Sequence, residues 1–321
     1  MLTLAACSSG GGSTNGDAPD GNGGEAITVG FTSPIASNSY TSTVTEAAQA
    51  VIEAAGGEFI LRDANLDPNQ QVTDIEYFIS TGVDSIIVHM PPVWEAIEPS
   101  LQAARDAGIS VIAHNVDMDY EAGTPADPMS AQVVDNRLEA AQMQFDFIKE
   151  QIPEGGKILF VGGPAPSPAI VSSEDEFMKL VDESAEFEMY DLVNNMTDNI
   201  AGAQPLVAAA LAADSDIVAV AAYNDPSAVG AAQAGLDAGR DLIVVGLQAQ
   251  PEGIDSIKAG VLNATVDLHV IEAGALLGEL ALKSFEGATD WETNYFIDPT
   301  LFDAANIDTF VSWDEQLAAL R

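Results

Sequence analysis

Basic residues and cysteine are both scarce in this sequence. Of its 321 residues, 10 are Lys or Arg against 50 Asp or Glu, and the formal net charge is −40. Proteins that bind nucleic acids need a basic face that displaces counterions from the phosphates, so we expect no DNA or RNA partner. The same acidity argues against adsorption to anionic membrane surfaces. A single cysteine leaves neither a disulfide framework nor a cysteine-rich metal site.

Long apolar runs and catalytic motifs are also missing from the sequence. No stretch approaches the roughly 18 consecutive apolar residues of a membrane-spanning helix. Neither G-x-S-x-G, G-x-G-x-x-G, a Walker A sequence nor H-E-x-x-H occurs, and the three histidines are isolated along the chain. We therefore expect a binding protein rather than an enzyme, with no cofactor and no metal.

The one cysteine, Cys7, follows Leu4-Ala5-Ala6 and precedes a run of small polar residues that reaches Gly24. Small residues before a cysteine are typical of the cleavage box of a bacterial lipoprotein signal, in which the cysteine is lipidated. A segment this rich in Gly and Ser cannot bury enough surface to fold. We expect residues 1–24 to be a signal remnant and flexible linker, and the folded part to be extracytoplasmic and lipid-anchored to the cell membrane. The alternative is an accidental cysteine in a polar tail.

From residue 25 onward, short apolar runs rich in Val and Ile alternate with longer amphipathic stretches. Runs such as 85–88, 157–161 and 242–245 are typical of strands buried on both faces, as in a parallel sheet. The stretches between them have the length of helices, and several end in a glycine that suits a helix C-terminus. A loop-like break at 120–129 separates two series of these units. The sequence thus predicts an α/β fold of two Rossmann-like parallel-sheet lobes.

Polar and aromatic side chains that follow the apolar runs are the candidate ligand contacts, because ligands of open α/β sheets bind beyond the carboxyl ends of the strands. The candidates are Asn38, Tyr40, His89, Trp94, Asn115, Asp117, Asp135, Asn224, Gln248 and His269. Amides and carboxylates can exchange hydrogen bonds with the hydroxyl groups of a neutral sugar or polyol. Aromatic rings can cover the apolar face of such a ligand.

Most of these candidates have a structural alternative as well. The alternatives are a helix cap for Asn38 and Asp135, a turn for Asn115 and Asp117, core or rim packing for Tyr40 and Trp94, and a buried histidine for His89 and His269. Around 267–269, an error of one residue in the strand register changes which side chain faces a cleft. The sequence leaves these alternatives open.

An ordered set of short segments covers residues 26–286. It includes DANLDPNQQ at 63–71, GVDSIIV at 82–88, AGISVI at 107–112, VDN at 134–136, AYND at 222–225 and GIDSIKAG at 253–260. In this order the segments resemble type I periplasmic solute-binding proteins of the ribose/galactose-binding group, which serve ABC importers. The resemblance implies two lobes joined by a three-strand hinge, with the ligand in the cleft between them. The N-terminal lobe would comprise 25–132 plus about 268–296, and the C-terminal lobe 133–267 plus about 297–321.

The same resemblance implies a function. The chain would be the solute-binding component of an ABC importer, a monomer that closes around a small neutral sugar or polyol and then docks on a membrane permease. Arginines that often occur in this group are missing from 170–177 and from the position of Val116 or Asp117. Their absence disfavours a carboxylate or phosphate ligand and leaves a neutral or even cationic one. The alternatives are a receptor for a furanose-like signal molecule, a ligand presenter to a chemoreceptor and, less favoured, a secreted α/β hydrolase.

Overall fold

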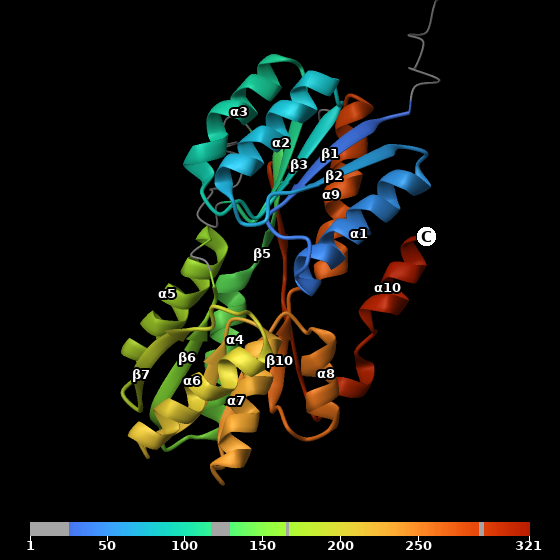
Figure 1. Cartoon of the computed structure of the whole chain (residues 1–321). Helices are drawn as coiled ribbons and strands as arrows, with labels where there is room; N and C mark the ends of the chain where they lie inside the picture. Colours follow the sequence, from blue (N-terminus) through green and yellow to red (C-terminus); the bar gives the residue numbers. More distant parts are fainter. Residues whose placement is uncertain (1–25, 117–128, 165–166, 289–291) are drawn as a thin grey trace, which may run out of the picture.

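Two α/β lobes, one above the other in Figure 1, make up the computed structural model of the chain. The structure describes residues 26–116, 129–164, 167–288 and 292–321, so Cys7, the expected linker and Asp117 lie outside the described residues. Each lobe contains one six-stranded sheet. The predicted α/β fold of two parallel-sheet lobes is confirmed.

The first sheet has the strand order β11-β5-β4-β3-β1-β2, with parallel pairing at each step. Its strands are β1 (Thr28–Ser33), β2 (Glu58–Asp63), β3 (Ser85–His89), β4 (Ser110–His114), β5 (Ala131–Asp135) and β11 (Asn294–Ile297). Its helices are α1 (Ser39–Ala54), α2 (Pro68–Thr81), α3 (Trp94–Asp106) and α9 (Val270–Phe285). Ile87 packs in the cluster beneath α1 and α9, whereas Ile86 packs in the cluster beneath α2 and α3. Because both faces of β3 are covered in this way, its sequence is a continuous apolar run.

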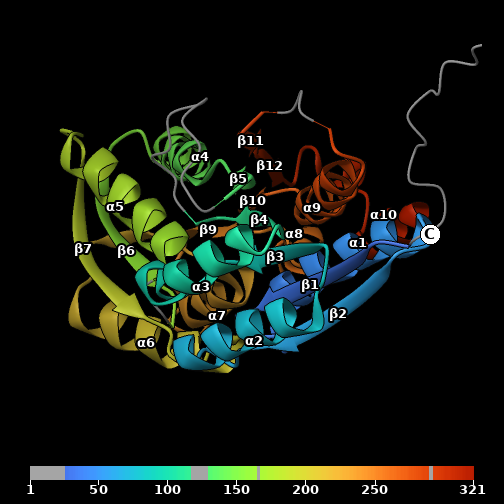
Figure 2. The ribbon, with the colours of Figure 1, turned by 90° about the horizontal axis from the view of Figure 1, so that it is seen from above.

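The second sheet has the order β12-β10-β9-β8-β6-β7, in which only β12 pairs antiparallel. Its strands are β6 (Gly156–Gly162), β7 (Phe187–Asn194), β8 (Ile217–Ala222), β9 (Ile243–Leu247), β10 (Ala264–Asp267) and β12 (Thr300–Asp303). Its helices are α4 (Arg137–Gln151), α5 (Pro168–Asp182), α6 (Ile200–Ala213), α7 (Asp225–Asp237) and α8 (Pro251–Lys258). The view from above in Figure 2 places β7 at the outer edge of this sheet.

The chain passes between the two sheets three times. The passages lie between β5 and α4, between β10 and α9, and between β11 and β12. β5 stays paired in the first sheet as far as Asp135, three residues beyond the lobe boundary expected at residue 132. β12 belongs to the second sheet, whereas α10 (Trp313–Leu320) packs against α1 and α9. Trp313 and Leu317 join the hydrophobic cluster of the first lobe, which explains why this last helix returns to it.

The helix ends follow ordinary chemistry. Gly82 ends α2 in the left-handed conformation, with φ of 70°, a backbone angle that costs glycine little. Asn136 rather than Asp135 caps α4, because its Oδ1 accepts a hydrogen bond from the backbone N–H of Glu139. Within the described ranges we find no helix with the length and apolar character needed to cross a bilayer.

Candidate functional site

A cavity of about 220 Å³ lies between the two lobes, beyond the carboxyl ends of their strands. It is smaller than the roughly 300–1,000 Å³ of pockets for drug-sized ligands, so it suits a small molecule. Half of the lining residues are apolar and they come from both lobes, for example Leu66 and Met90 from the first and Ile170 and Met196 from the second. The polar lining residues are Asn38, Tyr40, Thr41, Ser167, Thr197, Asp198, Tyr223 and Gln248.

Asn38 has both of the roles considered for it from the sequence. Its Oδ1 caps α1 by accepting hydrogen bonds from the backbone N–H groups of Tyr40 and Thr41, at 2.9 and 3.3 Å. Its Nδ2 points the other way and donates to Oδ2 of Asp198, at 2.7 Å. The start of α1 is thereby attached to the opposite lobe. Ser39 adds to this attachment, since its Oγ accepts a hydrogen bond from Nε2 of Gln250 at 2.6 Å.

Asp198 was not among the residues predicted from the sequence. It follows β7, an edge strand in which every side chain after Phe187 is half-buried or exposed and which therefore lacks a continuous buried apolar run. Its carboxylate accepts hydrogen bonds from Asn38, from the hydroxyl group of Tyr223 and from Nδ2 of Asn224. Burial raises the pKa of Asp198, and the hydrogen bonds from Asn38 and Asn224 oppose that rise. No ion pair joins Asp198 to any described basic residue.

Asn224 lies directly behind this carboxylate. Its Oδ1 caps α7 by accepting from the backbone N–H of Ser227 at 3.0 Å, while its Nδ2 donates to Oδ1 of Asp198 at 2.7 Å. Asn224 is buried and does not line the cavity itself. The predicted residue is thus brought to the site as the support of a carboxylate that does line it.

Gln248 lies at the cavity wall in a strained backbone conformation. Its φ is 94°, and that of the following Ala249 is 51°, so two non-glycine residues in a row occupy the left-handed half of φ. Only 6% of Gln248 is exposed, and its Oε1 has no hydrogen-bond partner. Ser167, also at the wall and 7% exposed, has an Oγ without a partner. Buried polar atoms are normally paired, so these two atoms point to a ligand that supplies the missing partners.

Tyr40 closes the cavity on the side of the first lobe and connects it to a buried network around Asp135. The Tyr40 hydroxyl donates to Oδ2 of Asp135, as does Nδ2 of Asn115 at 2.8 Å. Nε2 of His114 lies 3.1 Å from Oδ1, and Nη2 of Arg137 lies 3.3 Å from Oδ2. Burial opposes ionisation of Asp135, but His114, Arg137 and Tyr40 outweigh it and hold the pKa of Asp135 well below its usual range. Three predicted residues, Tyr40, Asn115 and Asp135, therefore meet at one point.

His89 belongs to the same interior rather than to the cavity wall. Its ring stacks on that of His114 with 4.8 Å between centroids, and the two Nδ1 atoms are 2.7 Å apart. Burial lowers the pKa of His89 well below its usual value, and the neighbouring His114 lowers it further. His89 is therefore neutral at neutral pH, and its Nε2 has no partner. The surroundings of His89 are therefore those of a buried histidine, the alternative to a ligand contact that the sequence left open.

The two remaining described candidates lie away from the cavity lining. Trp94 is the first residue of α3 and packs, partly buried, against the hydrophobic cluster beneath α2 and α3. His269 stands between β10 and α9 with φ of 50°, and its Nε2 lies 2.9 Å from Oγ1 of Thr300. Its backbone N–H donates to Oδ1 of Asp267 at 2.8 Å. These contacts place His269 at two of the three passages between the lobes.

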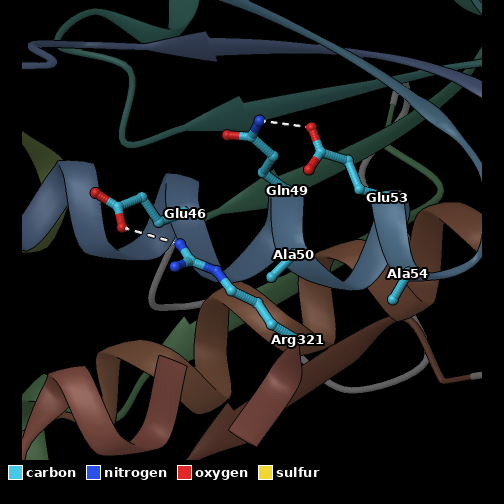
Figure 3. A pocket seen from close by; sticks show the side chains of 6 residues that line it. All are labelled: Glu46, Gln49, Ala50, Glu53, Ala54 and Arg321. Atoms are coloured by element: carbon cyan, nitrogen blue, oxygen red, sulfur yellow. Dashed lines mark hydrogen bonds and ion pairs between the residues drawn. The ribbon is translucent and has the colours of Figure 1, made fainter. Parts of the chain in front are cut away.

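A separate hollow lies outside the cleft, where the C-terminal residue meets α1 (Figure 3). Nη2 of Arg321 lies 3.6 Å from Oε2 of Glu46 there, and Gln49 donates to Glu53 further along the helix. None of the predicted residues lines this hollow. Across the parts of the chain that the structure describes, no three His, Cys, Asp or Glu side chains gather in a way that could hold a metal ion.

Comparison with known families and proteins agrees with this architecture. The family model described as a periplasmic binding protein domain matches residues 29–289. The ribose import binding protein of Bacillus subtilis (strain 168) is 25% identical over 266 residues, which are 80% of this chain and 80% of that protein. The xylitol-binding protein of Mycolicibacterium smegmatis is 24% identical over 79% of this chain and 72% of its own length.

Solved structures of the same shape include two that hold a carbohydrate or cyclitol. One is an ABC transporter solute-binding protein from Bacillus halodurans C-125 with bound myo-inositol, with a TM-score of 0.79, 24% identity and coverage of 88% of this chain and 96% of that one. The other is the binding protein of the arabinose ABC transporter from Shewanella sp. ANA-3 bound to arabinofuranose, with a TM-score of 0.80, 20% identity and coverage of 92% and 98%. At this level of identity the likeness concerns the fold.

Proposed function

As the chain belongs to the periplasmic binding protein domain family, we propose that it is the solute-binding component of an ABC importer for a small sugar or polyol. We assign it no catalytic step. The observation that carries the proposal is the cavity between the lobes, in which Gln248 and Ser167 have buried polar atoms without partners. Hydroxyl groups both donate and accept hydrogen bonds, so a polyol would satisfy both atoms.

Relatives support the choice of ligand class. The similar proteins of known name bind or import ribose and xylitol, and similar folds hold myo-inositol and arabinofuranose. These ligands share several hydroxyl groups on a small carbon frame. In the part of the chain that the structure describes, no Arg or Lys lines the cavity, as would be expected opposite a carboxylate or phosphate ligand.

The mechanism that we propose is closure of the two lobes around the solute. A ligand that contacts Tyr40 on one side and Gln248 on the other binds the closed arrangement more tightly than an open one. That difference in affinity shifts the population toward the closed form. The closed form would then dock on a membrane permease, with the chain acting as a monomer.

Calorimetric titration of the folded full chain, first freed of copurified solutes, tests this function. The panel would contain ribose, xylitol, arabinose, galactose and myo-inositol. We expect at least one dissociation constant in the micromolar range or below, which corresponds to about −8 kcal/mol. If no member of the panel binds to protein with a native circular-dichroism spectrum, the proposed ligand class is wrong.

The site of action follows from the family, whose members work outside the cytoplasm. We further propose that Cys7 carries a lipid that anchors the chain to the membrane, with the following polar segment as a tether. Expression in a bacterial host with a labelled fatty acid tests this. Label should appear in the wild-type chain and be lost in Cys7→Ala, and an unlabelled wild-type chain in the soluble fraction would rule the anchor out.

A further inference from the structure

The charged groups around the cavity allow the ligand class to be defined more closely than as a sugar or polyol. Among the described residues that line the cavity, Asp198 is the one carboxylate and none is a Lys, Arg or His. Arg137, the first residue of α4, lies over the Tyr40 ring and forms an ion pair with Asp135, so its charge is already matched. The cavity therefore presents a carboxylate whose charge nothing in the described residues balances.

The hydrogen bonds of Asp198 leave room for one more donor. Oδ1 accepts from Tyr223 and Asn224, whereas Oδ2 accepts only from Asn38. A carboxylate oxygen can accept two hydrogen bonds, so Oδ2 has a free position. The Tyr223 ring borders the same cavity and is fixed to the same carboxylate through its hydroxyl. A carboxylate beside an aromatic ring is a favourable environment for a cation.

The two polar atoms without partners, Oε1 of Gln248 and Oγ of Ser167, also favour a ligand that donates hydrogen bonds. Oε1 of Gln248 can only accept a hydrogen bond, and Oγ of Ser167 can do so as well. Both residues are more than nine-tenths buried. An ammonium group has three N–H donors and no acceptor, so a ligand with an ammonium and neighbouring hydroxyl groups matches this set of acceptors.

We infer that the solute is a polyhydroxylated amine, an amino sugar or an aminocyclitol, whose ammonium group binds Oδ2 of Asp198 while its hydroxyl groups contact Gln248 and Ser167. This inference rests on the proposed function, because it names a subclass of the same ligands at the same site. The apolar side chains of Met90 and Met196 then cover the carbon face of the ring.

Matched pairs of ligands test the inference by calorimetry on the full chain. The pairs are glucose and glucosamine, galactose and galactosamine, and myo-inositol and a monoamino inositol. We expect an amine to bind at least about tenfold more tightly than its hydroxyl counterpart, because its ammonium group adds a charge pair with Asp198 at hydrogen-bond distance. In Asp198→Asn the ratio of amine affinity to hydroxyl affinity should fall to about one.

The net charge of −40 attracts any cation, so a control must separate the cavity from the general field. Asp191→Asn removes an equal charge from the exposed face of β7 in the same lobe and should leave the ratio unchanged. A ratio near one in the wild-type chain overturns the inference even if Asp198→Asn does not fold. Equal binding of the amine and its neutral counterpart overturns the inference and leaves the proposed function intact. If neither these pairs nor any other sugar or polyol of the first panel binds, both are overturned.

Discussion

Nδ2 of Asn38 in the first lobe donates a hydrogen bond to Oδ2 of Asp198 in the second, over 2.7 Å, at the edge of the cavity that the two lobes enclose. Asn38 thus caps the start of α1 and also forms a hydrogen bond between the two lobes. The bond between Gln250 and Ser39 lies beside it, so two consecutive residues at the start of α1 are tied to the opposite lobe. The residues that stabilise the start of α1 therefore also stabilise the closed arrangement of the two lobes.

Substitution of Asn38 should separate these two roles. Asn38→Ala loses both the cap and the bond to Asp198, so it should lower the free energy of unfolding by about 1 kcal/mol and also weaken ligand binding. Asn38→Ser keeps a good cap but has a side chain too short to reach across the cleft. We expect its thermal unfolding to stay close to wild type while its dissociation constant rises. Equal loss of stability in both variants would contradict the division of roles.

Gln248 should matter for binding and little for stability. Gln248→Gly removes an amide whose Oε1 has no protein partner and suits a φ of 94°, a conformation that glycine adopts freely. We expect unchanged or slightly higher stability in urea unfolding, together with a loss of affinity of about tenfold, the value of one or two hydrogen bonds. Ala249→Gly is the matched backbone control and should leave affinity unchanged. Wild-type affinity in Gln248→Gly would remove this residue from the site.

Removal of one partner from the buried ion pair of Asp135 and Arg137 should strongly lower the free energy of unfolding. Asp135→Asn leaves the buried Arg137 without its counter-charge, and such a loss destabilises a protein by about 3–5 kcal/mol. Tyr40→Phe removes a single hydroxyl bond and should cost only about 1 kcal/mol. The double variant Asp135→Asn with Arg137→Met should recover much of the loss in chemical unfolding. Additive effects of the two substitutions would show that the ion pair does not couple them.

Asp267, at the second passage between the lobes, should make stability depend on pH. Burial raises its pKa from 3.8 to about 6, while His269 and its backbone N–H lower it and Asp135 raises it further. Because the folded state binds the proton more tightly than the unfolded state, stability from this group falls as pH rises from about 4 to about 6. A shift of this size corresponds to about 3 kcal/mol as an order of magnitude.

Unfolding free energies at pH 4, 5, 6 and 7 measure this effect. Asp267→Asn keeps an acceptor for the His269 N–H but cannot ionise, so its stability relative to wild type should rise across that interval. Asp298→Asn changes an exposed residue of the third passage, and as the control it should follow the wild-type profile. Parallel profiles for wild type and Asp267→Asn would show that this carboxyl titrates normally.

Much of the architecture could be predicted because the interior strands carry a strong signal. β3, buried on both faces, is a continuous apolar run, and the polar residues just after β1 and β9 include Asn38 and Gln248, which line the cavity. Asp198 could not be found in this way because it follows β7, an edge strand whose side chains are mostly half-buried or exposed. An acidic residue directly before the cap Asn199 was the available signal.

The sequence predicted where a residue lies along its strand better than it predicted the direction in which its side chain points. His89 ends a predicted strand, but its ring lies toward Phe31 and Tyr40, inside the cluster beneath α1 and α9. Sequence spacing places such a residue at the end of the sheet and does not say which layer of packing it enters. The return of α10 to the first lobe depends on Trp313 and Leu317 packing on distant helices, and no local pattern encodes that contact.

A crystal structure of the full chain with the tightest ligand from the titrations tests the central claim most directly. The account predicts that the solute lies between the lobes, in contact with Tyr40, Gln248 and Asp198. A solute bound in the outer hollow beside Arg321 (Figure 3), or on one lobe with the cleft empty, would contradict it.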